Sequence, residues 1–331
     1  MSGTRKTRNM PERMDLPFVG LTTFARQPAC TDWDLLDGAD VAVLGVPIDT
    51  ASSYRVGTRF GPRAIREASM FHAFGPDGVF DFEDEVTYLA AEEVRIVDAG
   101  DADVIYADTK RSLANAELAV RALRDAGTLP FILGGDHAIT MATVAGYAGE
   151  APFHIVHLDA HFDFIDERNG ISWGHGSPMR RASEMAHVTG ITTLGARNMA
   201  AVSRKDWERA RAYGSHIVPL RKLRAERAEA SLRHIGDGER VYVSIDIDAF
   251  DPSIAPGTAT ISHGGFTYYE ARDILKLIAR RCDVVGVDFV EVSPPYDPSG
   301  ITSLLAARVS LDFIGAIFHE RAKRRRRAGA P

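Results

Sequence analysis

The stretch "FHIVHLDAHFDF", residues 153–164, starts as an apolar run typical of a buried strand and ends with Asp159, His161 and Asp163 at alternate positions. Successive side chains of an extended segment point to opposite faces, so these three polar side chains share one face and the apolar residues between them take the other. The stretch therefore predicts a buried strand that carries three potential metal ligands to its carboxyl end.

Seven further segments of strand character alternate along the chain with segments of helical period, among them residues 109–127, 268–281 and 303–324. Alternation of this kind predicts an α/β fold, with a mostly parallel sheet of about eight strands covered by helices on both faces. The eight predicted strand segments are residues 40–49, 94–101, 129–135, 153–161, 190–197, 215–220, 240–248 and 283–292.

Composition and patterning predict a single soluble domain over residues 1–331, with a polar N-terminal extension (about 1–15) and a basic C-terminal tail (about 321–331). The net charge of -6 argues against nucleic acid or an anionic membrane as a partner. The polar opening lacks the apolar core of a signal peptide, and no later run approaches the ~20 apolar residues of a membrane span. We therefore expect a cytoplasmic protein.

Polar residues follow the predicted strands at their carboxyl ends, where open α/β sheets bind ligands. "ILGGDH" leads into His137, "SIDIDAFDP" places Asp246 and Asp248 at alternate positions, and the last strand ends in Glu291. Burying unpaired carboxylates is expensive unless a cation lies between them. Six residues of ligand type exceed what one tetrahedral zinc ion needs and suit two divalent ions. They are His137, Asp159, His161, Asp163, Asp246 and Asp248.

The segments "GGDHAIT", "DAHFD" and "SIDIDAFDPS" resemble the three signature motifs of the ureohydrolase family, which includes arginase, agmatinase and guanidinobutyrase. The resemblance implies a three-layer α/β/α domain that binds two divalent ions, usually manganese. Nickel is the alternative, known among relatives that act on free guanidine. The ligands implied are His137, Asp159, Asp163 and Asp246 for one ion, and Asp159, His161, Asp246 and Asp248 for the other.

The same resemblance implies hydrolysis of a small guanidino compound to urea, or a urea-like product, and an amine. A guanidinium is a poor electrophile, and two divalent ions supply a stronger nucleophile by lowering the pKa of water. Asp163 is expected to orient that nucleophile, and Glu291 to pair with two guanidinium nitrogens. His175 in "SWGHGSPM" matches the family's proton shuttle to the departing amine, and Thr260 matches its threonine beside the substrate.

The segment "ATISHGGFTYYE" departs from the usual family pattern. It resembles an agmatinase-like branch that includes hydrolases of guanidine, alkylguanidines and biguanides such as metformin. His263 is a candidate substrate contact there, with a backbone hydrogen bond in a Gly-rich turn as the alternative. Trp173 is a candidate pocket wall that would favour a methylated tail through cation–π contact, with core packing as the alternative.

The segment "FIDERNGISWG" bears on the tail of the substrate. Asp166 and Glu167 would repel a carboxylate if they faced the pocket, whereas Arg168 could pair with either acid or point outward. We therefore expect guanidines without a carboxylate, meaning agmatine, guanidine, or small N-alkyl guanidines and biguanides. Guanidinobutyrase or arginase-type activity is the alternative.

The family usually assembles into oligomers, so we expect a homo-oligomer, either a trimer or a hexamer, or a hetero-oligomer with a related subunit. A non-catalytic partner subunit is the alternative to an enzyme, but decay of the ligand set would then be expected, and all six ligands are retained. Deacetylases share the fold but keep one zinc ion and lack the full set of carboxylates. A count of two, one or zero ions per chain separates these three functions.

Overall fold

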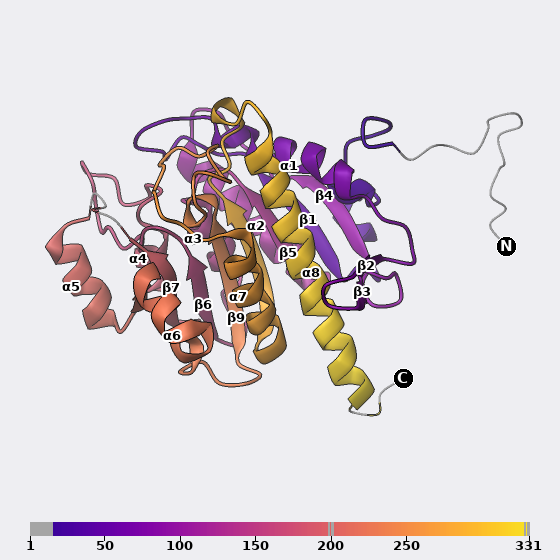
Figure 1. The fold of residues 1–331 in the computed structure, drawn as a ribbon. Helices are drawn as coiled ribbons and strands as arrows, with labels where there is room; N and C mark the ends of the chain where they lie inside the picture. Colours follow the sequence, from indigo (N-terminus) through magenta and orange to yellow (C-terminus); the bar gives the residue numbers. More distant parts are fainter. Residues whose placement is uncertain (1–15, 198, 200–201, 328, 330–331) are drawn as a thin grey trace, which may run out of the picture.

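The computed structural model describes residues 16–197, 199, 202–327 and 329. At its centre lies one sheet of eight parallel strands in the order β4-β1-β5-β10-β9-β6-β7-β8 (Figure 1). Each predicted strand segment matches one of these strands, although β7 begins two residues before its predicted segment, so the predicted sheet is confirmed. Their bounds are β1 (Val41–Val46), β4 (Ile96–Asp101), β5 (Leu129–Gly134), β6 (Phe153–Leu158), β7 (Val188–Ala196), β8 (His216–Pro219), β9 (Arg240–Asp246) and β10 (Asp283–Val290).

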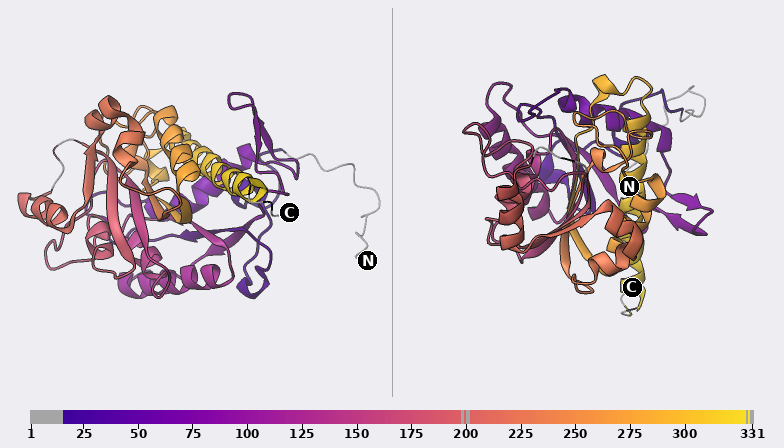
Figure 2. Two further views of the ribbon diagram at one scale, coloured as in Figure 1. Left: turned by 90° about the horizontal axis from the view of Figure 1, so that it is seen from below. Right: turned by 60° about the vertical axis from the view of Figure 1, so that its left-hand side comes forward.

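Helices cover both faces of the sheet and complete the predicted three-layer α/β/α fold (Figure 2). One layer contains α1 (Gly61–Ser69), α6 (Leu220–Leu232), α7 (Tyr268–Arg281) and α8 (Ile301–Arg327). The other contains α2 (Thr109–Asp125), α3 (Ile139–Ala145), α4 (Pro178–Ala182) and α5 (Arg204–Tyr213). Short 3-10 helices are η1 (Phe24–Arg26), η2 (Trp33–Leu35), η3 (Thr58–Phe60), η4 (Met70–His72), η5 (Ile247–Ala249) and η6 (Pro294–Tyr296).

Strands that are far apart in the sequence are neighbours in the sheet, because β10 lies beside β5 and β9 lies between β10 and β6. The division into a single domain stays a prediction. The predicted N-terminal extension, residues 1–15, lies outside the described residues, and so do residues 328, 330 and 331 of the predicted tail.

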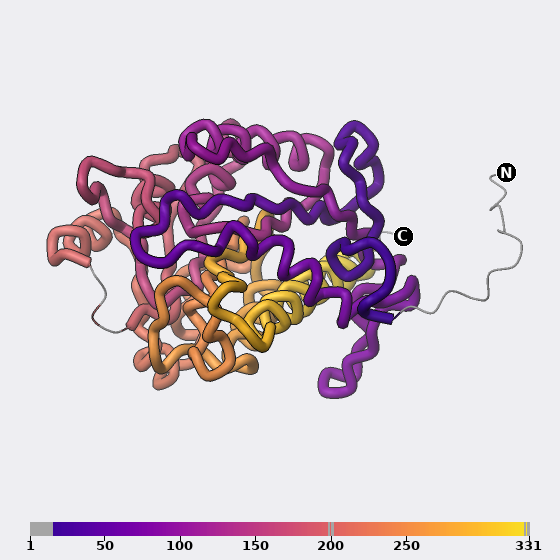
Figure 3. The backbone as a smooth tube through the Cα atoms, turned by 90° about the horizontal axis from the view of Figure 1, so that it is seen from above, coloured from indigo at the N-terminus to yellow at the C-terminus, as the bar shows by residue number. Residues whose placement is uncertain are grey.

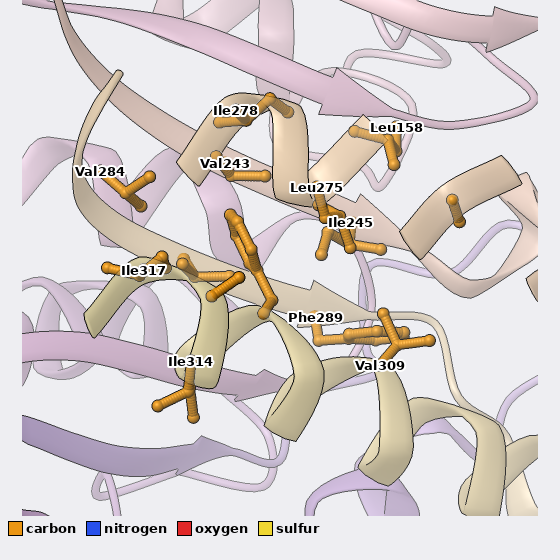
Figure 4. Close-up of a cluster of buried hydrophobic side chains, with 14 of the residues drawn as sticks. Leu158, Val243, Ile245, Leu275, Ile278, Val284, Phe289, Val309, Ile314 and Ile317 are labelled. Atoms are coloured by element: carbon orange, nitrogen blue, oxygen red, sulfur yellow. The ribbon is translucent and has the colours of Figure 1, made fainter. Parts of the chain in front are cut away.

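The sequence around α7 sets the bounds of that helix. The Thr267 hydroxyl accepts from the Glu270 N–H at 3.3 Å, and the Glu270 carboxylate accepts from the Thr267 N–H at 2.8 Å, which satisfies two donors of the first turn. The helix then buries Leu275 and Ile278 in the same cluster as Phe289 of β10 (Figure 4). Full burial of each such side chain contributes about 1.5–3 kcal/mol.

The last helix, α8, corrects one expectation from the sequence. We expected no segment apolar enough to span a membrane, but α8 meets that criterion by length and composition. Its most apolar window is 72% buried inside the protein, as in a core helix of a soluble fold. Basic residues continue the helix to Arg327, and Arg324 donates to the carbonyls of Ala279 at 2.8 Å and Cys282 at 3.1 Å. These contacts satisfy carbonyl groups that the end of α7 leaves open.

A hairpin of β2 (Val79–Asp81) and β3 (Val86–Tyr88) was not predicted. It projects from the body of the molecule beside α8 (Figure 3). Tyr88 anchors it on Gly315 of α8, where a Cβ would lie only 3.1 Å from the Tyr88 Cβ. The glycine therefore allows the hairpin to approach the helix closely.

His154, at the start of β6, is buried and shares a hydroxyl with a second histidine. The Thr192 Oγ1 lies 2.8 Å from His154 Nε2 and 2.7 Å from His234 Nε2. Burial, together with the nearby His234 and His216, lowers the pKa of His154 from 6.5 to about 4. Between these two values the unfolded chain binds more protons than the folded chain, so stability falls as the pH falls through this window.

We expect His154→Gln to reduce this acid sensitivity, because the amide can still bond Thr192 and does not titrate. The free energy of unfolding in urea is measured for both proteins at about pH 7.5 and about pH 5. The wild type should lose more stability between the two conditions than the variant does. Equal losses would show that protonation of His154 does not contribute.

Candidate metal centre

Four neighbouring strands, β5, β6, β9 and β10, deliver polar side chains to one edge of the sheet. Gly135, after β5, has a φ of +28°, and a Cβ there would lie 2.5 Å from the carbonyl oxygens of Val46 and Ile48. Its own carbonyl accepts a hydrogen bond from the Glu291 N–H at 2.9 Å. This bond connects the loop after β5 to the loop after β10.

His137 is the centre of the first cluster of predicted ligands. Its Nδ1 lies 3.0 Å from Asp246 Oδ2, 3.1 Å from Asp163 Oδ2 and 3.2 Å from Asp159 Oδ2. All four side chains are buried. The structure thus brings together the four residues that the sequence placed around one ion.

His161 is the centre of the second cluster. Its Nδ1 lies 3.2 Å from Asp248 Oδ2 and 3.3 Å from Asp159 Oδ1. Asp246 connects the two clusters, because its Oδ1 accepts from the Asp248 N–H at 2.7 Å while its Oδ2 faces the first cluster. Asp159 and Asp246 therefore occupy the positions expected of bridging ligands.

A chain of hydrogen bonds beneath His137 determines which ring nitrogen faces the carboxylates. The Ser244 hydroxyl donates to Asp288 at 2.6 Å, so its oxygen accepts from His137 Nε2 at 3.0 Å. In a neutral His137 the lone pair of Nδ1 would then face three carboxylate oxygens. That arrangement is repulsive unless a proton or a metal ion lies between them, so the donor set fits a cation.

Asp246 and Asp159, the two carboxylates that connect the clusters, have opposite pKa shifts. Burial, together with the neighbouring carboxylates of Asp248 and Asp159, raises the pKa of Asp246 well above its usual value. Burial also raises the pKa of Asp159, but the charge of His157 and the hydrogen bonds of nearby histidines outweigh it and hold the pKa well below the usual value. Four buried carboxylates beside two imidazoles are a charge arrangement that divalent cations would neutralise.

The structure adds His157 to the site, a residue that the sequence analysis left out. Its Nε2 lies 2.7 Å from Asp159 Oδ2. With His137, Asp159 and Asp163 it forms a group whose potential ligand atoms all lie within 4.8 Å of one another. His157 continues the alternation of residues 159, 161 and 163 backward by two positions, so the pattern already contained this signal.

Glu291 and His175 lie beside the first cluster. Glu291 has a left-handed backbone (φ +66°), as does Asp163 (φ +44°), and such strain in residues other than glycine collects at functional sites. Glu291 Oε1 accepts from the His137 N–H at 2.9 Å and from His175 Nδ1 at 3.1 Å. Its Oε2 is buried without a hydrogen-bond partner among the described residues, so this oxygen can receive a ligand.

His175 connects Glu291 to Ser53, which the sequence analysis missed. The Ser53 N–H donates to His175 Nε2 at 3.2 Å, and the Ser53 hydroxyl lies 2.8 Å from the same nitrogen. Burial lowers the pKa of His175, but the hydrogen bond and charge of Glu291 outweigh it and raise the pKa to about 9. Ser53 lies 122 residues before His175 in a loop without a motif, so no local pattern pointed to it.

A cavity of about 100 Å³ opens beside these residues. Water occupies about 30 Å³ per molecule in the liquid, so a cavity of this volume can hold only a small part of a ligand. Thr260 lines it, and the Thr260 hydroxyl donates to Asp248 at 3.1 Å. The described residues of the lining are Ser53, His137, His161, Asp163, Ile165, Arg168, His175, Gly176, Val202, Asp246, Asp248, Thr260 and Glu291.

Trp173 and His263, which we predicted as substrate contacts, are not among these described lining residues. The Trp173 ring lies 3.9 Å from Lys110 Nζ and packs against the core on the α2 side of the sheet. His263 is exposed, and its carbonyl accepts from Arg197 Nε at 3.1 Å. The position of Trp173 agrees with the alternative considered for it, core packing. For His263 the observed bond involves the main-chain carbonyl and not the imidazole, so the role of its side chain stays a prediction.

The acidic loop after the first ligand motif also differs from the expectation. Asp166 pairs with Arg180 at 3.3 Å, Arg181 at 2.7 Å and Arg209 at 3.1 Å, on α4 and α5. Its charge is therefore compensated by three cations. Arg168, in contrast, lines the cavity. Repulsion of a carboxylate by Asp166, which was one reason for predicting a substrate without that group, finds no support in this arrangement.

Comparison with known proteins agrees with this site. Residues 39–315 match the arginase family. The chain is 36% identical over 305 residues to guanidinopropionase from Pseudomonas aeruginosa, covering 90% of this chain and 92% of that protein. It is 34% identical over 317 residues to the mitochondrial guanidino acid hydrolase of Homo sapiens, covering 93% and 85%. The solved structure of proclavaminate amidino hydrolase from Streptomyces clavuligerus matches with a TM-score of 0.80 and 31% identity, covering 92% of this chain and 99% of that chain. The chain therefore belongs to the arginase family of C–N hydrolases.

Proposed function

We propose that this chain is a binuclear metal-dependent amidinohydrolase that cleaves a small guanidino acid to urea and an amine. The observation that carries the proposal is Glu291 Oε2, which is buried beside the ligand clusters without a partner among the described residues. A buried carboxylate oxygen of this kind is a suitable acceptor for a guanidinium, because the two groups form charge-assisted hydrogen bonds.

Members of the arginase family use a binuclear metal centre, usually with manganese, and the two clusters described above suit such a pair of ions. Two divalent ions bound there would lower the pKa of water and so supply the nucleophile. Manganese suits the excess of carboxylate ligands, and nickel is the alternative because imidazole also binds it. The residues that would hold the ions are His137, Asp159, Asp163 and Asp246 on one side, and Asp159, His161, Asp246 and Asp248 on the other.

Three side chains of the cavity would then act on the substrate and the attacking water. Glu291 holds the guanidinium through its open Oε2, and Asp163 orients the water by accepting one of its hydrogen bonds. His175 is protonated near neutral pH because its pKa is about 9, so it can deliver a proton to the departing amine. When His175 is protonated, its Nε2 carries a hydrogen and donates to the Ser53 hydroxyl 2.8 Å away. When the ring has given up that proton, the same nitrogen can accept from the Ser53 N–H at 3.2 Å.

Arg168 is the reason that we propose a substrate with a carboxylate on its tail. It lines the cavity, and a guanidinium fork can pair with a carboxylate through two parallel hydrogen bonds. The similarity to a guanidinopropionase and a guanidino acid hydrolase supports the same choice. We therefore favour guanidino acids over the agmatine, guanidine, alkylguanidines and metformin-like biguanides that the sequence suggested.

The test is product release from guanidinopropionate, guanidinobutyrate, agmatine, guanidine and metformin, with manganese and nickel supplied separately. The guanidino acids are expected to lead in kcat/KM by at least about tenfold, or about 1.4 kcal/mol of transition-state discrimination. Arg168→Gln should reduce this lead and leave agmatine cleavage unchanged, whereas Arg168→Lys should keep part of it. If agmatine or metformin leads instead, the substrate without a carboxylate is correct. If no compound reacts despite bound metal, the non-catalytic subunit is favoured.

His175→Asn is expected to lower kcat by about 10²- to 10⁴-fold, the usual contribution of a general acid. Asparagine keeps a polar group near Glu291 but cannot carry the proton. The matched control is His263→Asn, which changes an exposed histidine outside the described lining and should keep wild-type kcat. A normal rate in His175→Asn with normal metal content would place the proton donor elsewhere.

We also keep the cytoplasmic location inferred from the sequence. The burial of α8 supports this location, because the apolar surface of this helix packs inside the protein and does not need a membrane to cover it. The homo-oligomer expected from the sequence, a trimer or a hexamer, stays a prediction.

A further inference from the structure

We propose that His154, His216 and His234 form a further metal site, which binds one late transition-metal ion such as nickel or zinc. These three residues, which we call the histidine cluster, lie near the amino ends of the strands, whereas the carboxylate clusters follow the carboxyl ends. No residue belongs to both groups, so the proposal does not rest on the reaction that the catalytic centre performs.

Three neighbouring strands present the histidine cluster on one face of the sheet. His154 is on β6, Thr192 on β7 and His216 on β8, and Thr192 pairs in register with His216. By alternation along each strand, these side chains point to the same face, the one that α6 covers. His234 lies in the segment between α6 and β9, and its ring centroid is 5.6 Å from that of His154 and 4.4 Å from that of His216. His234 therefore joins the two strand histidines into one cluster.

Two of the imidazoles are directed at one point. Thr192 Oγ1 lies 2.8 Å from His154 Nε2 and 2.7 Å from His234 Nε2. A hydroxyl carries a single hydrogen, so it can donate to only one of these nitrogens, and the other nitrogen must bear a hydrogen to complete the pair of bonds. A metal ion at this point would instead take the lone pairs of both nitrogens. The hydroxyl thus marks a place where a cation can replace a proton.

The three rings differ in their freedom to move. His154 is buried, and a Cβ at Gly190 would lie only 2.8 Å from its ring, so a glycine is needed beside it. His216 and His234 are exposed. Their rings can therefore turn toward an ion, whereas His154 provides a fixed ligand.

The histidine cluster is uncharged near neutral pH. Burial is the main reason that the pKa of each of the three imidazoles lies below its usual 6.5, and the pKa of His154 falls to about 4. Metal ions bind the neutral form of imidazole. Protons therefore do not compete with a metal ion for these nitrogens at pH 7.

The donor atoms of the histidine cluster select the class of ion. Imidazole suits nickel, copper and zinc, whereas carboxylates and carbonyls suit manganese, magnesium and calcium. Two acids lie near these rings, but Glu226 pairs with Lys222 at 3.9 Å, and Glu239 accepts from the Gly236 N–H at 2.8 Å. The cluster should therefore prefer nickel or zinc to manganese, in contrast to the carboxylate-rich catalytic centre.

An ion bound to the histidine cluster would stabilise one end of the sheet. β8 is the last strand in the sheet order, where it pairs with β7. Shared coordination by His216 and His154 would connect this edge strand to β6, and His234 would add the segment before β9. An ion that binds the folded chain in this way raises the free energy of unfolding.

The test is the number of nickel ions that the full chain binds after saturation with manganese. Calorimetric titration with nickel chloride, followed by gel filtration and elemental analysis, compares the wild type with His216→Ala/His234→Ala. The wild type should bind one more metal ion per chain than the variant, and nickel should raise Tm further in the wild type. Because the two proteins have the same catalytic centre, this difference is informative whether that centre binds two ions, one or none.

His216→Ala alone should raise the Kd for this nickel ion at least about tenfold, since even outer contacts of a metal ligand contribute about 10- to 100-fold to affinity. His263→Ala is the matched control, because it removes an exposed imidazole outside the histidine cluster, and it should bind nickel as the wild type does. Circular dichroism shows whether each variant is folded, and the Kd of His216→Ala decides if the double variant is not. Equal nickel counts in the wild type and the double variant would overturn the proposal, as would an equal loss in the control.

Discussion

Glu291→Gln is expected to lower kcat/KM by at least about 100-fold while leaving the metal content unchanged. Removing one partner of a buried charge pair costs about 2–5 kcal/mol, and each 1.36 kcal/mol of transition-state stabilisation is a factor of ten in rate. Glutamine is the informative replacement because its carbonyl oxygen can still accept from the His137 N–H, as Glu291 Oε1 does at 2.9 Å. Its NH₂ group would occupy the position of the open Oε2 and face the guanidinium with hydrogen atoms.

The same variant has a second expected result at His175. Burial lowers the pKa of His175, and the carboxylate of Glu291 is the main reason that the pKa nevertheless rises to about 9. In Glu291→Gln the His175 pKa should therefore fall, which NMR titration of the imidazole can measure. Glu93→Gln is the control, since Glu93 pairs with His319 and Arg326 away from the cavity. Near-normal turnover in Glu291→Gln would mean that the guanidinium binds elsewhere.

The fold was predictable because the buried parallel strands are short apolar runs, each followed by a loop or helix signal. The hairpin was missed because "VFDFEDEVTY" carries four acids and reads as a polar loop. Its acids are matched by bases of α7 that lie far away in the sequence: Arg272 pairs with Asp81, and Lys276 with Asp84. Long-range pairing of this kind cannot be seen from a local pattern.

The candidate site was also predictable from the sequence only in part. The alternating pattern was enough to predict that Asp159, His161 and Asp163 act together, and the structure brings all three beside the ligands from β5 and β9. They lie in the loop after β6, which ends at Leu158, and not on an extended strand as predicted. The direction of the next loop was not predictable. Asp166 pairs with arginines of α4 and α5, whereas Arg168 lines the cavity, and these two positions change the substrate we favour.

Removal of metal ions is expected to abolish activity and to lower Tm by more than about 10 °C. An ion present at 1,000 times its Kd stabilises the folded chain by about 4 kcal/mol, so two ions contribute about 8 kcal/mol. At roughly 2.1 cal/mol/K of unfolding entropy per residue, a chain of 331 residues shifts by roughly 1.4 °C for each kcal/mol. The physical reason is the pair of clusters around His137 and His161, where buried carboxylates otherwise face one another. Dialysis against a chelator, followed by calorimetry, urea assays and re-addition of manganese, measures both effects.

Asp248→Asn should affect one metal site and spare the other, because Asp248 pairs with His161. It does not approach the His137 ring nitrogen as Asp246 does. The variant should retain about one ion per chain, lose most activity and show roughly half of the stabilisation that metal gives the wild type. Asp237→Asn, at an exposed acid paired with Arg281, is the control and should retain two ions. A single ion in fully active wild-type protein would contradict a binuclear mechanism and leave only the His137 cluster as a metal site. Two ions with no activity on any guanidine would instead separate metal binding from catalysis, since the ligands would then be intact and the fault would lie with Glu291, His175 or a missing partner subunit.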